Sequence, residues 1–488
     1  MKFKTLSLLV MSAFCANAQF NWFGCFQKCI PTFKCNPAPV PSGTYAVNPM
    51  GVVSCIAATN YYNTISSAIA AAPSGAVIHV CPGTYAEQVT ITKPVTVVGI
   101  VTGSAPNYNY PTVVPEVGFG PTLVGGKPVL PTSPSLQDGL PVAAQIAVIG
   151  TTASVENLLL IGTNNGLTTS SLTAHLFGIY YQNASGTISG NMVTEELTPT
   201  TAGEETGYGI FVESGKPGGV GTAGSTTVSI TNNGVLDFQT IGIGAVGAST
   251  TATVTGNSLA LSTGTFAAQS PNGIEFESAG GSISNNTIAK ISSTSGFASV
   301  GIFLVASGGI SVTSNTVTAV DAPILTFSDS KVPTSSNPDG ASDNTTITGN
   351  SVTGTNFKLA DGIDVCSNYN TINSNTTTNT QNAGIHLDTG CPGTKGTKDA
   401  TSGNNNSVQF NNISYTCEGI AEGGDYNSAF FNNVSNSTNV IFQGDYCGVS
   451  ESTVGNVNLL DGLNNPLGLS LFQLLQDLLK PILAVCFH

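Results

Sequence analysis

Residues 360–391 of the chain carry a dense set of side chains suited to acid–base chemistry. Asp361, Asp364, His386 and Asp388 fall within two similar units, because Gly-Ile-Asp returns one unit later as Gly-Ile-His. If the two units stack as neighbouring strands, Asp364 and His386 lie roughly 4.8 Å apart and the Asp364 and Asp388 backbones about 8 Å apart. Inverting glycosidases separate their two carboxyl groups by about 6.5–9.5 Å, which admits a water molecule.

The sequence therefore predicts a catalytic pair, Asp364 and Asp388, with His386 adjusting one carboxylate and Asp361 in support at the loop edge. The alternative is a solvated polar patch on a repetitive scaffold. Repetition alone would bring Asp364 and His386 together, whether or not they react.

A second acidic set is formed by Glu213, Glu275 and Glu277. Carboxylate oxygens are ligands that Ca²⁺ prefers, so Glu275 and Glu277 are candidate metal ligands. The predicted hydrolysis requires no cofactor. Bound calcium would, however, let an acidic surface hold a uronic acid. The alternative is a pair of exposed acids on a strand.

Two short units recur along the chain and set the architecture. The first is Gly-Ile-x-φ-x, where φ is apolar, as in "GIYYQ" from Gly178, "GIEFE" from Gly273 and "GIDVC" from Gly362; its spacing has a minimum of 22 residues. The second is φ-x-x-Asn-x-φ, which lies between copies of the first. Its asparagines are Asn191, Asn233, Asn257, Asn286, Asn315, Asn350, Asn375, Asn411 and Asn432.

These units are rich in β-branched residues and alternate with period 2, which indicates short strands rather than the helices of an α-solenoid. The predicted fold class is all-β, a single-stranded right-handed parallel β-helix of ten to twelve coils. The nine asparagines are predicted to form a ladder, each side-chain amide donating to its counterpart on the next coil.

Residues 61–100, from "YYNTISSAIAAAP" to "PGTYAEQVTITKPVTVVGI", resemble the opening of pectin lyase-like right-handed β-helix proteins. The resemblance extends over about residues 55–447 and implies a helix covering the N-terminal end, followed by a Pro-Gly-Thr-Tyr turn and the first coil. Ile65, Ala68, Ile69 and Ala72 form the apolar stripe of that helix. Because enzymes, adhesins and phage tail proteins share these motifs, the resemblance specifies the fold and not the activity.

No enzyme family within this group is matched. "ADGIDV" resembles the Thr-Asp-Gly-Ile-Asp stretch of polygalacturonase-type glycoside hydrolases, but the adjacent Asp-Asp pair, Gly-His-Gly and Arg-Ile-Lys are absent from the sequence. Pectate lyases typically use Arg or Lys as the base. With no arginine in the chain, only a lysine such as Lys290 or Lys358 would serve.

The first and third residues after each Ile are predicted to point outward. This face mixes aromatic rings with carboxylates, the residue types that sugar sites use. Long insertions border it on both edges and predict a groove. Its predicted substrate-binding residues are Tyr180, Phe211, Glu213 and Phe303.

The ends of the chain have their own signatures. Residues 1–18 read as a secretory signal peptide, too short to span a membrane. The predicted divisions are a Cys-rich arm at 19–54, the β-helix at 55–450 with a loop insertion at 102–142, and a C-terminal tail at 451–488. Within the tail, 466–487 is favoured as an amphipathic cap over a membrane anchor because charged residues and a proline interrupt it.

The mature chain keeps 11 of 13 lysines and all 27 acidic residues, a formal charge of −16. Nucleic acid is therefore an unfavourable partner. Ten cysteines remain after the signal peptide, which predicts disulfides in an exported protein.

We thus expect a secreted or cell-surface monomer without a transmembrane span. It would bind an extracellular polysaccharide along the Gly-Ile face and, as an enzyme, hydrolyse it. The alternative is a non-enzymatic adhesion solenoid, and the third hypothesis is a calcium-dependent uronate lyase.

Overall fold

The computed structural model describes most of the region between residues 43 and 443. The described residues are 43–49, 55–104, 107–115, 122–124, 127–129, 135–136, 142–163, 175–197, 207–215, 224–262, 271–292, 298–327, 341–355, 361–389, 392–393, 397–398 and 402–443. Among them, no helix reaches the length and apolarity needed to cross a membrane.

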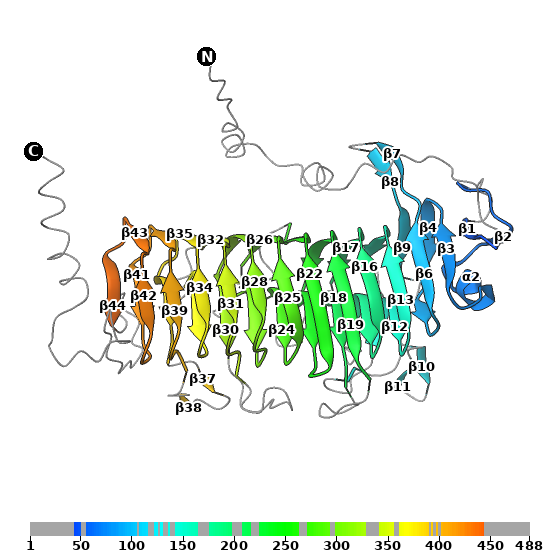
Figure 1. The fold of residues 1–488 in the computed structure, drawn as a ribbon. Coiled ribbons are helices and arrows are strands. Elements are labelled where there is room, and N and C mark those ends of the chain that lie inside the picture. Colours follow the sequence, from blue (N-terminus) through cyan, green and yellow to red (C-terminus); the bar gives the residue numbers. More distant parts are fainter. Residues whose placement is uncertain are drawn as a thin grey trace, which may run out of the picture.

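The described chain winds into a solenoid with three long parallel sheets, seen from the side in Figure 1. Each coil contributes one strand to each sheet, and each strand pairs with its counterparts on the neighbouring coils. This is the predicted right-handed parallel β-helix. We call the sheets A, B and C, in the order in which each coil reaches them.

Sheet A has 14 strands, and its order along the solenoid is β2 (Asn60–Tyr62), β1 (Tyr45–Val47), β3 (Ala76–Val80), β6 (Val95–Gly99), β13 (Thr152–Glu156), β16 (Ser185–Ser189), β19 (Thr226–Thr231), β22 (Thr250–Thr255), β25 (Gly280–Ser284), β28 (Ser311–Thr313), β31 (Thr346–Thr348), β34 (Thr371–Asn373), β39 (Ser407–Gln409) and β42 (Ser428–Phe430).

Sheet B has 12 strands, in the order β4 (Gly83–Ala86), β9 (Pro111–Val114), β14 (Leu159–Ile161), β17 (Met192–Glu196), β20 (Gly234–Phe238), β23 (Ser258–Ala260), β26 (Thr287–Ile291), β29 (Thr316–Val320), β32 (Ser351–Gly354), β35 (Thr376–Thr378), β40 (Asn412–Ser414) and β43 (Asn433–Ser435).

Sheet C, which contains the Gly-Ile units, also has 12 strands: β5 (Val89–Ile91), β12 (Val142–Ile149), β15 (His175–Gln182), β18 (Gly207–Glu213), β21 (Ile241–Val246), β24 (Asn272–Glu277), β27 (Val300–Val305), β30 (Ala322–Phe327), β33 (Ile363–Cys366), β36 (Ala383–Leu387), β41 (Glu418–Glu422) and β44 (Asn439–Gln443).

Three antiparallel hairpins lie outside the coils, namely β7 (Thr102–Ser104) with β8 (Asn107–Asn109), β10 (Thr122–Val124) with β11 (Lys127–Val129), and β37 (Pro392–Gly393) with β38 (Thr397–Lys398). Part of the predicted loop 102–142 belongs to the solenoid instead, because β9 pairs with β4 and β14 in sheet B.

One continuous hydrophobic core runs the length of the solenoid and is built from the inward side chains of all three sheets. In sheet C, for example, Ile274, Ile302, Ile324 and Ile363 stack in register on successive coils and are fully buried. Each such side chain contributes about 1.5–3 kcal/mol by leaving water. The isoleucine of the repeat is therefore a core residue.

The predicted asparagine ladder is confirmed at all nine positions. From Asn191 to Asn432, each side-chain amide nitrogen donates to the Oδ1 atom of the asparagine on the next coil, at 2.9–3.1 Å. The same Oδ1 also accepts the preceding asparagine's backbone N–H. The ladder thereby satisfies buried polar groups at the turn between sheets A and B.

A second, shorter ladder is not anticipated from the repeat pattern. Asn370 donates through its side-chain amide and its backbone N–H to Asn406 Oδ1, and the backbone N–H of Asn406 donates to Asn427 Oδ1 at 2.8 Å. It lies between sheets C and A, five residues before the first ladder in the sequence, and asparagine occupies this position on only three coils.

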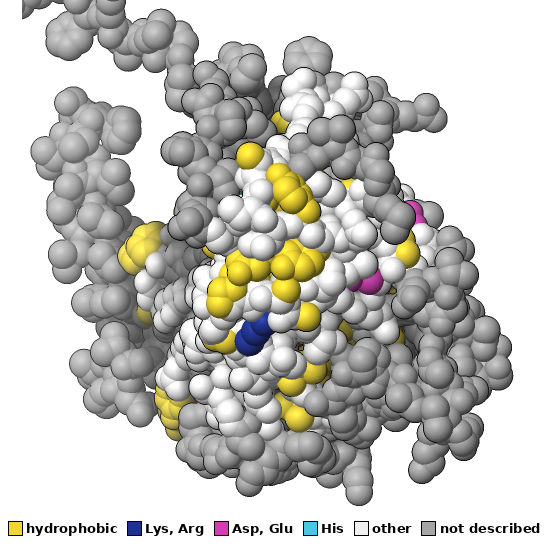
Figure 2. All heavy atoms as spheres, turned by 90° about the vertical axis from the view of Figure 1, so that its right-hand side faces the viewer, with side chains coloured by type: hydrophobic (Ala, Val, Ile, Leu, Met, Phe, Trp, Pro, Cys, Tyr) yellow, Lys and Arg dark blue, Asp and Glu magenta, His cyan; other side chains and the backbone are white. Residues whose placement is uncertain are grey.

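The helix α2 (Ile65–Ala71) lies at the N-terminal end, with Ile65, Ala68 and Ile69 buried. The Thr64 side chain accepts a hydrogen bond from the Ser67 N–H, and the carboxylate of Glu87 accepts from the backbone N–H groups of Ile65 and Ser66. These acceptors satisfy donors that the first turn leaves free. Figure 2 looks onto this end, where hydrophobic side chains gather on the described surface.

The predicted disulfides are confirmed where the structure describes the cysteines. Cys55 is bonded to Cys81, and Cys366 and Cys417 are each disulfide-bonded as well. The remaining cysteines and the segment 466–487, predicted to cap the C-terminal end, lie outside the described residues.

One core position holds a carboxylic acid. Glu196 is fully buried and pairs with Phe238 on the next coil. Neither of its carboxyl oxygens has a hydrogen-bond partner among the described residues. The two oxygens lie close to Gly162 and Gly178. A Cβ atom added to Gly162 would lie 2.5 Å from Oε2, and one added to Gly178 would lie 3.1 Å from Oε1. Burial, with a smaller contribution from the charge of Glu195, raises the pKa of Glu196 well above its usual value.

We predict that replacing a ladder residue, by Asn286→Ala, lowers the free energy of unfolding by about 2 kcal/mol or more. The side-chain amide and backbone N–H of Asn257 lose their acceptor. Denaturant unfolding followed by circular dichroism measures the change. Thr287→Ala, at the exposed neighbouring position, is the control. Equal unfolding midpoints for the two variants would contradict a stabilising ladder.

We predict that Glu196→Leu stabilises the protein by about 1–3 kcal/mol near pH 8, because it removes an unpaired buried acid. Because the pKa of Glu196 is raised in the folded state, the acid is neutral in both states below its unfolded pKa, and stability is highest there. Stability is then lost as the pH rises towards the folded pKa. Melting temperatures from pH 4 to 9 should show this decline in the wild type and less of it in Glu196→Leu. Parallel curves would refute the assignment.

Candidate functional site

The outward column that contains Asp364 lies on sheet C, with the register predicted from the repeats. Asp364 of β33 pairs with His386 of β36, and the column continues to Leu325 on one side and Ala421 on the other. The proximity of Asp364 and His386 is therefore confirmed and follows from the register of the strands.

Glycine is required where sheet C begins, because the backbone passes close to the side chains of sheet B. A Cβ atom on Gly362 would collide with Thr377 Cγ2 and lie 2.6 Å from the Gly384 carbonyl oxygen. Asp361, the residue before Gly362, therefore lies beside the start of β36 on the next coil. The repeat thus positions Asp361 without requiring an acid there.

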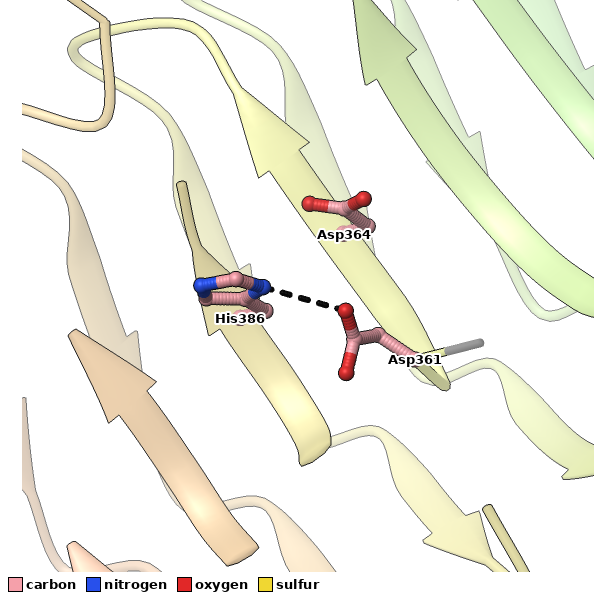
Figure 3. A group of neighbouring side chains, drawn as sticks. All are labelled: Asp361, Asp364 and His386. Atoms are coloured by element: carbon pink, nitrogen blue, oxygen red, sulfur yellow. Dashed lines mark hydrogen bonds and ion pairs between the residues drawn. The ribbon is translucent and has the colours of Figure 1, made fainter. Parts of the chain in front are cut away.

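Asp361 and His386 form the central contact of the site (Figure 3). Asp361 Oδ2 lies 3.0 Å from His386 Nδ1, and Asp361 Oδ1 accepts a hydrogen bond of 2.6 Å from the Ala383 N–H. Both side chains are at most 6% exposed. Asp361 is thus anchored on one oxygen and orients the imidazole with the other.

His386 is surrounded by carboxylates. Burial alone would lower its pKa, but the charge and hydrogen bond of Asp361, with the charges of Asp388 and Asp364, raise it well above its usual value. This shift favours the positively charged form of His386. Its Nδ1 atom faces Asp361 Oδ2.

Asp364 and Asp388 both lie next to Cys366. Carboxylate oxygens of the two acids and the sulfur of Cys366 all lie within 4.8 Å of one another. The nearest oxygens of the two acids are thus no farther apart than the carboxyl groups of retaining enzymes, which are separated by about 5–5.5 Å. The predicted spacing of about 8 Å refers to the backbones, and the side chains approach each other more closely than the backbones do.

Asp388 is 5% exposed, whereas Asp364 is only partly buried. Asp364 is therefore the member of the site most accessible to a ligand on the outer face of sheet C.

Three of the predicted binding residues are covered. Tyr180, Phe211 and Glu213 point outward in register, but all three are buried in the structure. The rings belong to a second hydrophobic cluster with Phe177 and Tyr208. In these positions they cannot stack on a sugar, so the structure does not support their predicted contact with substrate.

Glu213 links the buried Tyr180 to Leu136, a residue from a different segment. One of its oxygens accepts hydrogen bonds from the Tyr180 hydroxyl and from the backbone N–H of Leu136, the latter at 2.8 Å. Burial raises the pKa of Glu213, although the hydrogen bonds of Leu136 and Tyr180 oppose the shift. The alternation of the strand predicts the direction of these side chains, but nothing in it reveals that Leu136 covers them.

The remaining predicted residues keep partial exposure. Phe303 packs against Leu325, and its ring lies 6.2 Å from that of Phe327. Glu275 and Glu277 are half-buried on β24, and Glu275 accepts a hydrogen bond of 2.7 Å from the Asn272 side chain. These residues lie on the same face as Asp364, two and three strands away.

The calcium prediction at Glu275 and Glu277 remains a prediction. Within the described part of the chain, the groups of three potential ligands are Asp361–Asp364–His386 and Asp364–Cys366–Asp388. An imidazole does not suit Ca²⁺, which prefers oxygen, and a sulfur in a disulfide is no thiolate ligand. We therefore interpret this cluster in terms of proton transfer and charge.

Comparison with known proteins agrees with the fold. Residues 218–398 match the family model described as the right handed beta helix region. With the three stacked sheets, this match identifies the fold as a right-handed parallel β-helix. No curated protein matches the sequence.

Several solved structures resemble the chain at low identity. The A-module of mannuronan C-5 epimerase AlgE4 from Azotobacter vinelandii is 13% identical, with 79% of this chain and 91% of that chain covered and a TM-score of 0.46. The GH136 lacto-N-biosidase from Eubacterium ramulus is 12% identical, with coverages of 82% and 68% and a TM-score of 0.47. DFA-IIIase from Arthrobacter chlorophenolicus A6 is 13% identical, with coverages of 79% and 88% and a TM-score of 0.38. These similarities concern the fold and carry no argument about activity.

We predict that the charge of His386 contributes to stability at neutral pH and that this contribution is lost in alkali. Because its pKa is raised in the folded state, the contribution is complete below the unfolded pKa of about 6.5 and disappears as the pH rises through the folded pKa. The difference in melting temperature between wild type and His386→Gln should therefore shrink from pH 6 to pH 10. A difference that is constant or grows with pH would contradict this charge assignment.

Proposed function

We propose that this protein is a secreted glycoside hydrolase that cleaves a neutral polysaccharide bound along the outer face of sheet C. Asp364 and Asp388 are the proposed reactive carboxyl groups. His386 and Asp361 are the supporting pair. The observation that carries the proposal is the convergence of three carboxylates on one buried imidazole.

This convergence is not required by the scaffold. The same outward column holds Gly244, Phe303, Leu325 and Ala421 on other coils, so small and apolar residues are compatible with the fold. Taking charged groups out of water costs several kcal/mol per ion unless they are well paired. Such clusters of buried, coupled charges occur preferentially at functional sites.

The geometry supports a division of roles. Asp364 is the more exposed acid, so we assign it to attack at the anomeric carbon of the sugar, and Asp388 to proton transfer with the glycosidic oxygen. The positively charged His386 lies beside Asp364 and partners the carboxylate that must be ionised to attack. Asp361 is a positioning residue, since it holds the imidazole by a hydrogen bond.

The surroundings favour a neutral substrate. Leu325 and Phe303 lie one and two strands from Asp364 and offer partly exposed apolar surface for a sugar ring. The site itself is rich in carboxylates, which repel uronic acids in the absence of a bound cation. A uronate lyase would also need a lysine base, but Lys290 belongs to β26 in sheet B and Lys358 lies outside the described residues.

We predict that Asp364→Asn and Asp388→Asn each reduce the release of new reducing ends by at least about 100-fold. The assay uses a panel of neutral and acidic polysaccharides, with and without calcium, and also follows absorbance near 235 nm to detect lyase products. Asp425→Asn, an exposed acid outside the cluster, is the matched control and should retain full activity.

The outcomes separate the alternatives. New reducing ends accompanied by absorbance near 235 nm would indicate the uronate lyase, because elimination leaves an unsaturated sugar that hydrolysis does not. Glycan binding without any cleavage would indicate the adhesion solenoid. Full activity of Asp364→Asn would refute the catalytic assignment.

A further inference from the structure

Cys366 occupies an unusual place in the column next to Asp364. Its side chain lies on the same outward face of β33, two residues after Asp364, and is 1% exposed. Its sulfur lies 3.7 Å from Asp364 Oδ1 and 4.0 Å from Asp388 Oδ2. Cys366 therefore contacts both acids, Asp364 along its own strand and Asp388 on the next coil.

The oxidation state of Cys366 determines the nature of these contacts. The residue is disulfide-bonded, so its sulfur has no proton and cannot donate a hydrogen bond to either carboxylate. The contacts are therefore van der Waals contacts. A free thiol would instead donate to one acid, and a thiolate would add a third negative charge.

The backbone beside Cys366 and at Asp388 is fixed by hydrogen bonds. The Asp388 N–H donates to the Val365 carbonyl oxygen at 3.0 Å, and the Ser402 hydroxyl donates to the Asp388 carbonyl oxygen at 2.8 Å. With both main chains held, the separation of the two carboxyl groups depends on the side chains and on the sulfur that contacts both of them.

We propose that the disulfide-bonded sulfur of Cys366 is a positioning element that sets the separation and orientation of Asp364 and Asp388. This inference rests on the proposed hydrolase function. It makes full activity depend on the oxidised state of Cys366, as suits a protein that works outside the cell.

The first test compares Cys366→Ala with Cys366→Ser. Alanine leaves space in which the two acids approach each other, so the acidic limb of the kcat pH profile should move to higher pH. Serine supplies a hydroxyl donor that stabilises a carboxylate, so that limb should move to lower pH. We expect kcat to fall about 10-fold or more in both variants, with KM changed less than kcat.

The matched control removes a disulfide that is remote from the site, by Cys55→Ala with Cys81→Ala. This double variant should lose stability but keep the wild-type kcat and pH profile, because the bond lies at the N-terminal end of the solenoid. Folded Cys366 variants with unchanged kcat and pH profile would overturn the proposal. If these variants remain active while Asp364→Asn is inactive, the inference fails and the proposed function stands.

A second measurement covers the case in which the variants do not fold. The wild type is treated with a phosphine, which supplies two electrons and is oxidised to the phosphine oxide. The disulfide takes up these electrons and two protons and becomes two thiols. Alkylation followed by mass spectrometry gives the reduced fraction of Cys366. We expect activity to fall in proportion to that fraction. Full activity with Cys366 completely reduced would overturn the proposal.

Discussion

The hydrogen-bonded register between successive coils is the constraint on which the rest of the structure depends. Each strand of sheets A, B and C pairs in parallel with its counterpart one coil away, so equivalent residues stack into columns. Inward columns become the hydrophobic core, the turn columns become asparagine ladders, and outward columns become a surface of stacked side chains. The site around Asp364 is a local cluster of charged residues in an outward column of mixed composition, rather than a separate structural unit.

This constraint has two consequences for interpreting the site. The register alone explains why Asp364 contacts His386, so their proximity is weak evidence for catalysis. The contact between Asp361 and His386 is more informative, because Asp361 lies before the strand and its carboxylate is aimed by a hydrogen bond from Ala383. The strand pairing does not require an acid there. Four ionisable groups at one place therefore call for a chemical explanation.

Much of the fold could be predicted from the sequence because the repeat is strict where packing demands it. Gly362 and Gly384 are needed for close backbone approach, the isoleucines fill the core, and the nine asparagines bond to one another. The second ladder, from Asn370 to Asn427, was not anticipated because asparagine occupies its position on only three coils, too few to stand out as a repeat. Phe410 and Phe431 were also unforeseen. They adopt positive φ at the turn before a ladder asparagine, and their rings stack on the surface with centroids 5.2 Å apart.

The sequence predicted which residues come together at the site, but not their exposure or the distances between their side chains. Alternation gives the direction of Tyr180, Phe211 and Glu213, but their burial depends partly on Leu136, a residue on a different segment with no repeat signal. The spacing of the Asp364 and Asp388 carboxyl groups depends on rotamers and on contact with the Cys366 sulfur, neither of which a sequence pattern encodes.

The most direct measurement of the central claim is the trapping of a covalent intermediate. The protein is incubated with a 2-fluoro glycoside of the sugar that it releases, digested, and analysed by mass spectrometry. We predict one glycosyl adduct on the peptide that contains Asp364, as the short carboxyl separation implies for a retaining hydrolase. An adduct on a different acidic residue, or product of inverted configuration without any adduct, would contradict the assignment of Asp364 as the attacking group.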